Sequence, residues 1–277
     1  MTCPSAAQTV QLKNAVIITS PSVSPAMRTT ISQVLSEEIA KRTGIVLKNT
    51  ANWPKKGTTA IALVLSTDDQ LMGTAVPLRQ DKQSAEYQRE GFRVVSTITA
   101  NGAVVWIIGA DNRGLLFGAG WLLRNLDMAP HRLQLNEKTD IASSPAYPIR
   151  GHQLGYRTTA NSYDAWTVAQ YDQYIRELAI FGTNAVEGIP FHEDETPSPL
   201  FTIPAAEMNI RLSEICQKYD MDYWVWTPAT FDLTDKAKRK VELDMHENFY
   251  RKCPRLDHIF FPGGDPGDNH PSEVMPF

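Results

Sequence analysis

The sequence predicts an α+β domain over residues 1–145, followed over residues 146–277 by an α/β region that forms a partial (β/α)8 barrel of about four βα units. Two observations predict this division. After residue 148, short apolar runs alternate with helical patterns of about 15 residues, which is typical of parallel βαβ units. Before that, small residues and two prolines at 142–148 interrupt any regular element and mark the boundary.

The first region combines a small sheet with helices. Its expected elements are strands at 15–18, 60–65, 92–98 and 104–108, a helix that ends at Gly44, and a helix at 114–126. Asn101-Gly102 is a two-residue turn of the hairpin-forming kind between the last two strands. Because the second helix carries leucines on one broad face, we expect the helices to cover one side of the sheet.

The second region has a regular alternation. Its expected elements are strands at 149–154, 184–189, 223–226 and 258–261, and helices at 166–181, 205–219 and 236–251. An open doubly wound sheet is the competing architecture. Against it, no GxGxxG or P-loop motif follows the first strand, where a nucleotide-binding sheet usually has its glycines.

Four βα units make half of a barrel, whose chemistry lies at the carboxyl ends of the strands. We therefore expect half an active site in this sequence and at least one catalytic group beyond Phe277. A half barrel leaves two strand edges unpaired and an apolar interior open to water. We expect such a chain to self-associate through these edges.

The composition limits the partners. The chain of 277 residues has 42% hydrophobic and 21% charged residues and a net charge of −4, with Lys and Arg scattered along it, so nucleic acid is not an expected partner. No apolar run reaches the roughly 18 residues of a membrane span. Residues 1–8 are polar and small, as in mature exported chains, and we expect a secreted or periplasmic protein.

The cysteines give no sign of a metal site. Cys3, Cys216 and Cys253 are widely spaced, without the CxxC or Cys/His pattern of metal ligands, and we expect neither metal nor cofactor. Cys216 shares the apolar side of its helix and is expected to pack as a small hydrophobic residue.

Polar residues near the predicted strands are the candidates for chemistry. Glu187 stands out because a lone carboxylate in an apolar strand is costly to bury unless it is partnered or functional. Trp224 and Trp226 are two residues apart and face the same side, either a ligand or the helices. Arg150 is either a substrate ligand or a structural ion-pair partner.

The remaining candidates lie in predicted loops. His192 begins a charged run that is either part of the site or a solvated loop, and Asp265 and Asp268 flank glycines and a proline in what is either a site or a turn. Carboxylates, tryptophans and an arginine together are what a sugar site needs: acids for proton transfer, aromatic faces for stacking and charged donors for hydroxyl groups.

Three segments resemble a known family. The strand and Ala110-Asp111-Asn112-Arg113-Gly114 turn at 105–120 is similar to the small α+β domain that precedes the barrel in family 20 glycoside hydrolases, the β-N-acetylhexosaminidases, and in α-glucuronidases. Arg150-Gly151 is similar to the start of the hexosaminidase barrel, which implies that Arg150 contacts sugar hydroxyls. Gly263-Gly264-Asp265 resembles the segment with the catalytic pair, which implies that Asp265 orients the acetamido group.

The resemblance also has a departure. Pro266 stands where the hexosaminidases have the general-acid glutamate, so a related enzyme with different acids, such as an α-glucuronidase-like glycosidase, is a comparable interpretation. The sequence thus predicts hydrolysis of O-glycosidic bonds in an oligosaccharide or polysaccharide, with Asp265 and Asp268 as catalytic carboxylates. Arg150, Glu187, His192 and Trp226 are expected to bind the substrate. The alternatives are a non-catalytic glycan-binding module and an inactive fragment.

Overall fold

The computed structural model describes residues 9–53, 55–99, 102–155, 163–191, 199–229, 231–261 and 269–276. Its contacts divide the chain into two compact units, the first Met1–Pro148 with Ala179–Gly182 and the second Ile149–Leu178 with Thr183–Phe277. Within the described residues, every helix is too short or too polar to cross a membrane. The protein is of the mixed α/β kind, as the sequence predicts.

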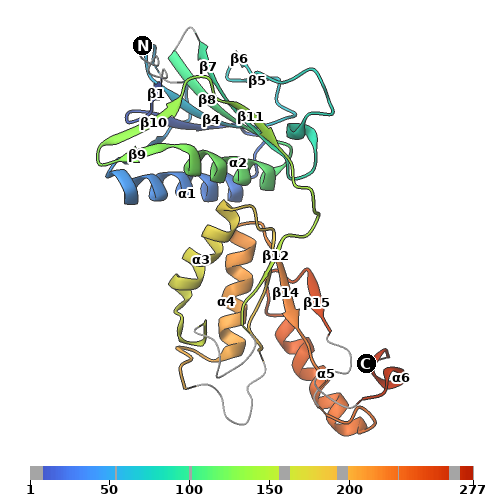
Figure 1. Cartoon of the computed structure of the whole chain (residues 1–277). Helices are drawn as coiled ribbons and strands as arrows, with labels where there is room; N and C mark the ends of the chain where they lie inside the picture. The colour runs from blue at the N-terminus through green and yellow to red at the C-terminus, as the bar shows by residue number, and fades with distance from the viewer. Residues whose placement is uncertain are drawn as a thin grey trace, which may run out of the picture. The chain divides into compact units, whose positions relative to one another are not determined.

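The first unit is built on a six-stranded mixed sheet with the order β11-β7-β8-β4-β2-β3 (Figure 1). These strands are β2 (Val16–Thr19), β3 (Lys48–Asn49), β4 (Ala60–Leu65), β7 (Phe92–Thr99), β8 (Gly102–Gly109) and β11 (Asp140–Ser143). β3, β2, β4 and β8 are parallel neighbours, whereas β7 runs antiparallel to both β8 and β11. The antiparallel pairing of β7 with β8 confirms the predicted hairpin.

Smaller elements complete this unit. They are the three-stranded antiparallel sheet of β1 (Thr9–Gln11), β10 (Arg132–Asn136) and β9 (Asp127–Ala129), the two-stranded ribbon of β5 (Gln70–Leu71) and β6 (Thr74–Ala75), and the 3-10 helix η1 (Ala85–Tyr87). β11 corrects the sequence analysis, because Ala142 and Ser143 pair with Arg93 and Phe92 instead of belonging to an irregular boundary.

Helices α1 (Pro25–Thr43) and α2 (Asn112–Asn125) lie on one face of the six-stranded sheet (Figure 1), as predicted. α1 begins with Ser24, whose hydroxyl accepts a hydrogen bond from the Met27 amide, and ends at Gly44 in the left-handed conformation with φ of 72°. The opposite face of the sheet buries a second apolar cluster around Trp106, which is 1% exposed. The first unit therefore has apolar layers on both sides of its sheet.

The turn at 110–114 has a structural role. The Asp111 carboxylate accepts hydrogen bonds from the Gly114 and Glu90 amides, both 2.8 Å long, and so caps α2 and ties it to the chain before β7. Arg113 forms an ion pair with the buried Glu90. A Cβ on Gly114 would come within 2.1 Å of the Gly91 carbonyl oxygen, so only glycine fits there. The motif that carries the family resemblance thus fixes this corner of the fold.

The second unit is built on a four-stranded parallel sheet whose spatial order follows the chain: β12 (Gly151–Gln153), β13 (Ala185–Glu187), β14 (Asp222–Trp226) and β15 (His258–Phe260). Its helices are η2 (Tyr163–Ala165), α3 (Val168–Ile180), α4 (Ala205–Lys218), α5 (Lys236–Tyr250) and α6 (Pro271–Val274). The predicted alternation of strands and helices after residue 148 is therefore confirmed for these residues.

One face of the parallel sheet is packed against helices. Val186, Tyr223 and Val225 point to this face and are at most 1% exposed. Tyr223 donates a hydrogen bond of 2.6 Å from its hydroxyl to Asn209 Oδ1 on α4. Cys216, also on α4, is fully buried, which confirms the prediction that it packs as a small hydrophobic residue.

Candidate functional site

The other face of the parallel sheet carries the polar and aromatic side chains. Side chains alternate between the two faces of a strand. Because Tyr223 and Val225 point to the helices, Trp224 and Trp226 point to the opposite face, which we call the open face. Both tryptophans are only half-buried. Of the two interpretations that the sequence leaves for them, packing against the helices is therefore wrong.

A row of four side chains crosses the open face in strand register. Gln153 pairs with Glu187, Glu187 with Trp224, and Trp224 with His258. The Gln153 amide Nε2 donates to Glu187 Oε1 at 3.1 Å, and the rings of Trp224 and His258 lie 4.4 Å apart between centroids. A hollow of about 200 Å³ lies against this row, with the lining residues Ile149, Gly151, His152, Gln153, Ala185, Glu187 and Trp224.

Two groups on this face have unused bonding capacity. Burial raises the pKa of Glu187, and the hydrogen bond from Gln153 opposes this rise only in part. Trp224 Nε1 is buried and has no hydrogen-bond acceptor among the described residues. Buried polar groups are nearly always hydrogen-bonded, so the free indole N–H is suited to a ligand oxygen. The open face thus combines an aromatic surface, a donor and a carboxyl group that holds its proton more tightly than an exposed one.

The backbone at the end of β13 is tightly constrained. Gly188 follows Glu187, and a Cβ at this position would come within 2.5 Å of both Asn209 Oδ1 and Tyr223 Oη. Its amide donates to the Trp224 carbonyl oxygen at 2.9 Å. The close approach of α4 and β14 to this glycine fixes where the Glu187 side chain leaves the strand.

His152 belongs to the helix-packed face. Its Nε2 lies 2.9 Å from the Tyr174 hydroxyl and 3.5 Å from the Tyr163 hydroxyl, and burial lowers its pKa. His152 is therefore a neutral partner of tyrosines near neutral pH. No cluster of His, Cys, Asp and Glu with metal-ligand geometry occurs in the part of the chain that the structure describes.

The amino edge of the sheet carries a different cluster. Arg255 forms ion pairs with Asp220, Asp222 and Asp257 at 2.8, 3.1 and 2.8 Å. Asp257 also accepts a hydrogen bond from the Tyr223 amide, so the cluster ties the starts of β14 and β15 together. In parallel α/β sheets this edge contributes stability, whereas the carboxyl ends of the strands carry function.

Arg150 lies at the amino edge as well. It immediately precedes β12, its amide donates to Asn184 Oδ1 at 2.8 Å, and its carbonyl oxygen accepts from the Asn184 amide at 3.1 Å. Arg150 therefore lies where the strands begin, whereas Glu187 and Trp226 are the last residues of β13 and β14 and lie on the open face. Asp265, Asp268 and His192 lie outside the described residues.

His258 was not singled out from the sequence. It starts the predicted fourth strand, but its place beside Trp224 follows from the register of β14 with β15, which the sequence alone does not give. Asp222 was missed for the same reason, since it is the first residue of β14 and pairs with Ala185.

The chain is similar to known proteins in its fold. No family model matches the chain, and no curated protein sequence matches it. Among solved structures, the chain is similar to the GH20 β-N-acetylhexosaminidase from Streptomyces coelicolor A3(2), with 13% identity, a TM-score of 0.67, and 98% of this chain and 60% of that chain covered. It is also similar to a chitobiase (FjGH20) from Flavobacterium johnsoniae, with 14% identity and a TM-score of 0.60. This match covers 94% of this chain and 42% of that chain.

The protein CpGH84B is a third similar structure, with 14% identity, a TM-score of 0.57, and coverage of 92% of this chain and 41% of that chain. The chain therefore spans between 41 and 60% of the length of these three proteins. The predicted resemblance to hexosaminidases is confirmed for the fold. The structural neighbours are glycoside hydrolases.

Proposed function

We propose that residues 146–277 form the first half of a (β/α)8 barrel and that residues 1–145 form a small accessory domain. We further propose that the open face is part of the active site of a glycoside hydrolase. The strand order supports the barrel, because β12 to β15 are neighbours in chain order, whereas a doubly wound sheet reverses its order. Buried side chains on one face and half-buried ones on the other support it as well.

The row from Gln153 to Trp224 beside its hollow is the observation that carries the proposed sugar site. A tryptophan with a free N–H next to a protonatable carboxyl group fits a sugar, which offers apolar C–H faces for stacking and hydroxyls as acceptors and donors. In this proposal Glu187 and Trp226 form the wall of the site.

The chemistry is assigned to carboxyl groups near the strand ends. One protonates the leaving oxygen of the glycosidic bond, and the other stabilises the anomeric centre or activates water. We assign these roles to Asp265 and Asp268, with His192 as a further substrate ligand, on the family resemblance alone. Arg150 is left out of this proposed site because it lies at the amino edge of the sheet.

The test is hydrolysis of aryl glycosides by the intact protein that carries these residues. Cleavage of a hexosaminide, a glucuronide or a neutral glycoside is expected, with loss of at least about a hundredfold in kcat for Asp265→Asn. Asp244→Asn, which changes an exposed aspartate on α5, is the control and should keep full activity. Absence of turnover on all three substrate classes would remove the hydrolase proposal.

A second candidate function is a non-catalytic glycan-binding module, favoured by Pro266 in place of the acid that follows Asp265 in the resembling enzymes. Calorimetric binding of oligosaccharides, weakened by Trp224→Ala and not accompanied by hydrolysis, would support the module. Turnover that depends on Asp265 would exclude it.

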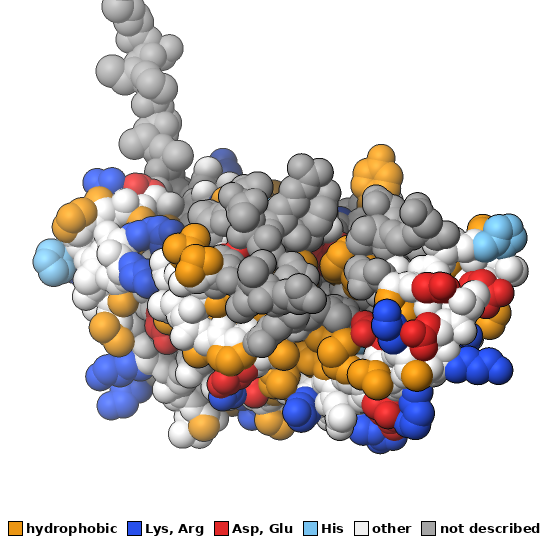
Figure 2. Space-filling view, turned by 90° about the horizontal axis from the view of Figure 1, so that it is seen from below, with side chains coloured by type: hydrophobic (Ala, Val, Ile, Leu, Met, Phe, Trp, Pro, Cys, Tyr) orange, Lys and Arg blue, Asp and Glu red, His pale blue; other side chains and the backbone are white. Residues whose placement is uncertain are grey.

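Exposed apolar side chains on α5 and β15 bear on the partners. Val241, Leu243, Ile259 and Phe260 are 39 to 69% exposed. Figure 2 shows hydrophobic side chains at the surface between charged ones on the face that it draws. We propose that further barrel units or a second copy of the chain cover these residues. Secretion, or a periplasmic location, stays a prediction.

A further inference from the structure

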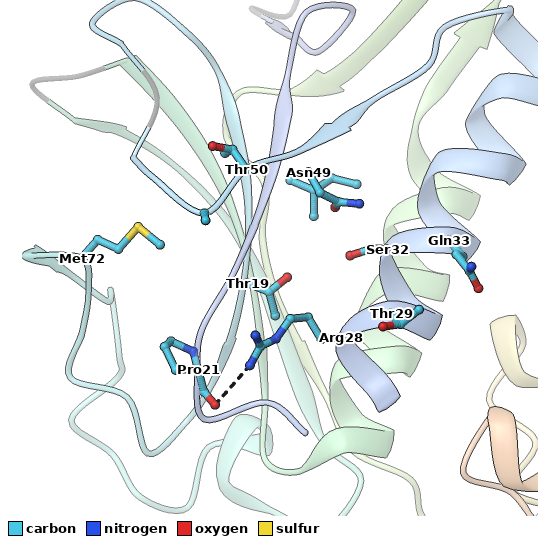
Figure 3. A pocket seen from close by; sticks show the side chains of 11 residues that line it. Thr19, Pro21, Arg28, Thr29, Ser32, Gln33, Asn49, Thr50 and Met72 are labelled. Atoms are coloured by element: carbon cyan, nitrogen blue, oxygen red, sulfur yellow. Dashed lines mark hydrogen bonds between the residues drawn. The ribbon is translucent and has the colours of Figure 1, made fainter. Parts of the chain in front are cut away.

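The first unit carries a hollow of its own. Its volume is about 530 Å³, within the range of roughly 300–1,000 Å³ that small-molecule sites occupy. It lies between α1 and the ends of β2 and β3 (Figure 3), and its polar lining includes Thr19 on β2, Arg28 and Ser32 on α1, and Asn49 on β3.

The position of this hollow follows from the sheet topology. β2 lies between β3 and β4, and all three strands are parallel, so their carboxyl ends meet at one edge. The connection after β2 passes through α1 to β3 on one side, and the chain then continues to β4 on the other side. Ligands of parallel sheets bind at the carboxyl edge where neighbouring connections diverge.

Arg28 supplies a positive charge that no described carboxylate neutralises. Its Nη2 donates to the Pro21 carbonyl oxygen at 3.3 Å (Figure 3) and to that of Val23 at 3.2 Å, and these bonds hold the guanidinium in place. Among the described residues, no carboxylate pairs with Arg28, and its Nη1 makes no hydrogen bond. A fixed guanidinium with a free edge is suited to a carboxylate ligand.

Ser32 supplies a hydroxyl that has no partner among the described residues. The residue is 6% exposed, lines the hollow, and makes no side-chain hydrogen bond to any residue that the structure describes. The Thr19 hydroxyl is likewise unused within the described residues. Figure 3 shows Ser32 reaching from α1 and Thr19 from β2 toward the same space. Two hydroxyls that line one hollow and have no partner among the described residues are available to bind a polar ligand.

We propose that this hollow binds a small carboxylate that carries hydroxyl groups, of the size of a monosaccharide acid. Arg28 Nη1 binds the carboxylate, and Ser32, Thr19 and Asn49 bind the hydroxyls. None of the described residues that line the hollow is Asp or Glu, so an anion meets no repulsion from them. Ile17 and Met72 add apolar surface for the carbon skeleton.

Calorimetric titration of the whole chain with four probes tests the ligand class. D-glucuronate should bind at least tenfold more tightly than glucose, which lacks the charge, and than acetate, which lacks the hydroxyls. Equal affinity for glucose and glucuronate would overturn the role of Arg28, and no detectable binding of glucuronate would overturn the site. Inorganic phosphate that binds more tightly than glucuronate would overturn the carboxylate assignment.

Variants on α1 test the residues. Ser32→Ala should weaken glucuronate binding about three- to tenfold, the effect of one hydrogen bond. The same change should leave the thermal midpoint unchanged or raise it, because alanine favours the helix more than serine does. Ser36→Ala changes a serine of α1 outside the lining and should alter neither affinity nor specificity.

Arg28→Gln should reduce binding at least tenfold, and Arg28→Lys should give an intermediate affinity because it keeps the charge but loses the planar fork. Unchanged affinity in Ser32→Ala and Arg28→Gln would overturn the proposal. Glu187→Gln on the open face of the second unit should leave this binding unchanged, so failure here is distinct from failure of the proposed glycosidase.

Discussion

Gln153 and Glu187 are register partners on adjacent parallel strands, and the Gln153 amide is a hydrogen-bond donor to the Glu187 carboxyl group at 3.1 Å. This bond favours the ionised carboxyl group, whereas burial disfavours it more strongly and raises the pKa of Glu187. The open face therefore carries a carboxyl group whose charge is costly in the folded protein.

Glu187→Gln is expected to stabilise the fold at neutral pH. A carboxyl group with a raised pKa binds more protons in the folded state, so the wild-type protein loses stability as pH rises from the ordinary glutamate pKa through the raised one. The gain of the variant should be at most about 1 kcal/mol, because the half-buried group is screened. This gain in stability should vanish at acidic pH, where the wild-type carboxyl group is protonated. Urea unfolding of both proteins at a series of pH values measures it.

Gln153→Leu provides the matching test, since it removes the hydrogen bond that lowers the pKa of Glu187. In that background, the stabilisation by Glu187→Gln should grow. A stability difference that does not change with pH would show that Glu187 is not responsible.

Arg255→Gln is expected to destabilise the protein by about 2–4 kcal/mol. Burial alone would lower the pKa of Arg255, but hydrogen bonds with Asp257 and Asp220 raise it, which reflects how strongly these carboxylates hold the cation. Without Arg255 three partly buried carboxylates face one another. Arg251→Gln, which breaks an exposed pair with Glu247, should cost less than about 1 kcal/mol in the same denaturation experiment.

The two described cysteines should differ in reactivity. Burial raises the pKa of Cys253 to about 11 and that of the fully buried Cys216 further. In a Cys3→Ser background, a thiol reagent should modify Cys253 slowly, with a rate that rises about tenfold per pH unit below pH 11. Cys216 should react only after unfolding. Rapid modification of Cys216 in the native protein would contradict its burial.

Self-association is expected to depend on β15 and α5. Ile259→Lys and Val241→Lys place charges on side chains that are 49 and 69% exposed and should shift the protein toward monomer in sedimentation velocity. Val46→Lys, at a side chain of the first unit that is 72% exposed, is the control and should leave the distribution unchanged. A wild-type chain that stays monomeric at high concentration would argue against this proposal.

The sequence was sufficient for the elements with a clear period. The strand at 60–65 and the helices that end near Gly44 and Tyr219 are found within one or two residues of their predicted ends. The strands of β5 and β6 have two residues each, too few to show alternation. β10 does alternate, with Leu133 and Leu135 buried, and could have been predicted from this pattern.

The site was only partly predictable. The spacing of Trp224 and Trp226 predicts that both lie on the same side of their strand. Which side this is depends on tertiary packing, because Tyr223 and Val225 occupy the side that the helices cover. Arg150 is only three residues before Gln153, which ends β12, yet its backbone pairing with Asn184 places it where the strands begin. Register between strands is a tertiary property, and a single sequence does not contain it.

The crowding around Gly188 determines which positions a redesign of the proposed sugar site can vary. Any larger residue there would push against Asn209 and Tyr223 and displace the anchor point of Glu187, so a saturation library should leave this codon fixed. Variation belongs at residues 153 and 224, which flank Glu187 in strand register on the open face.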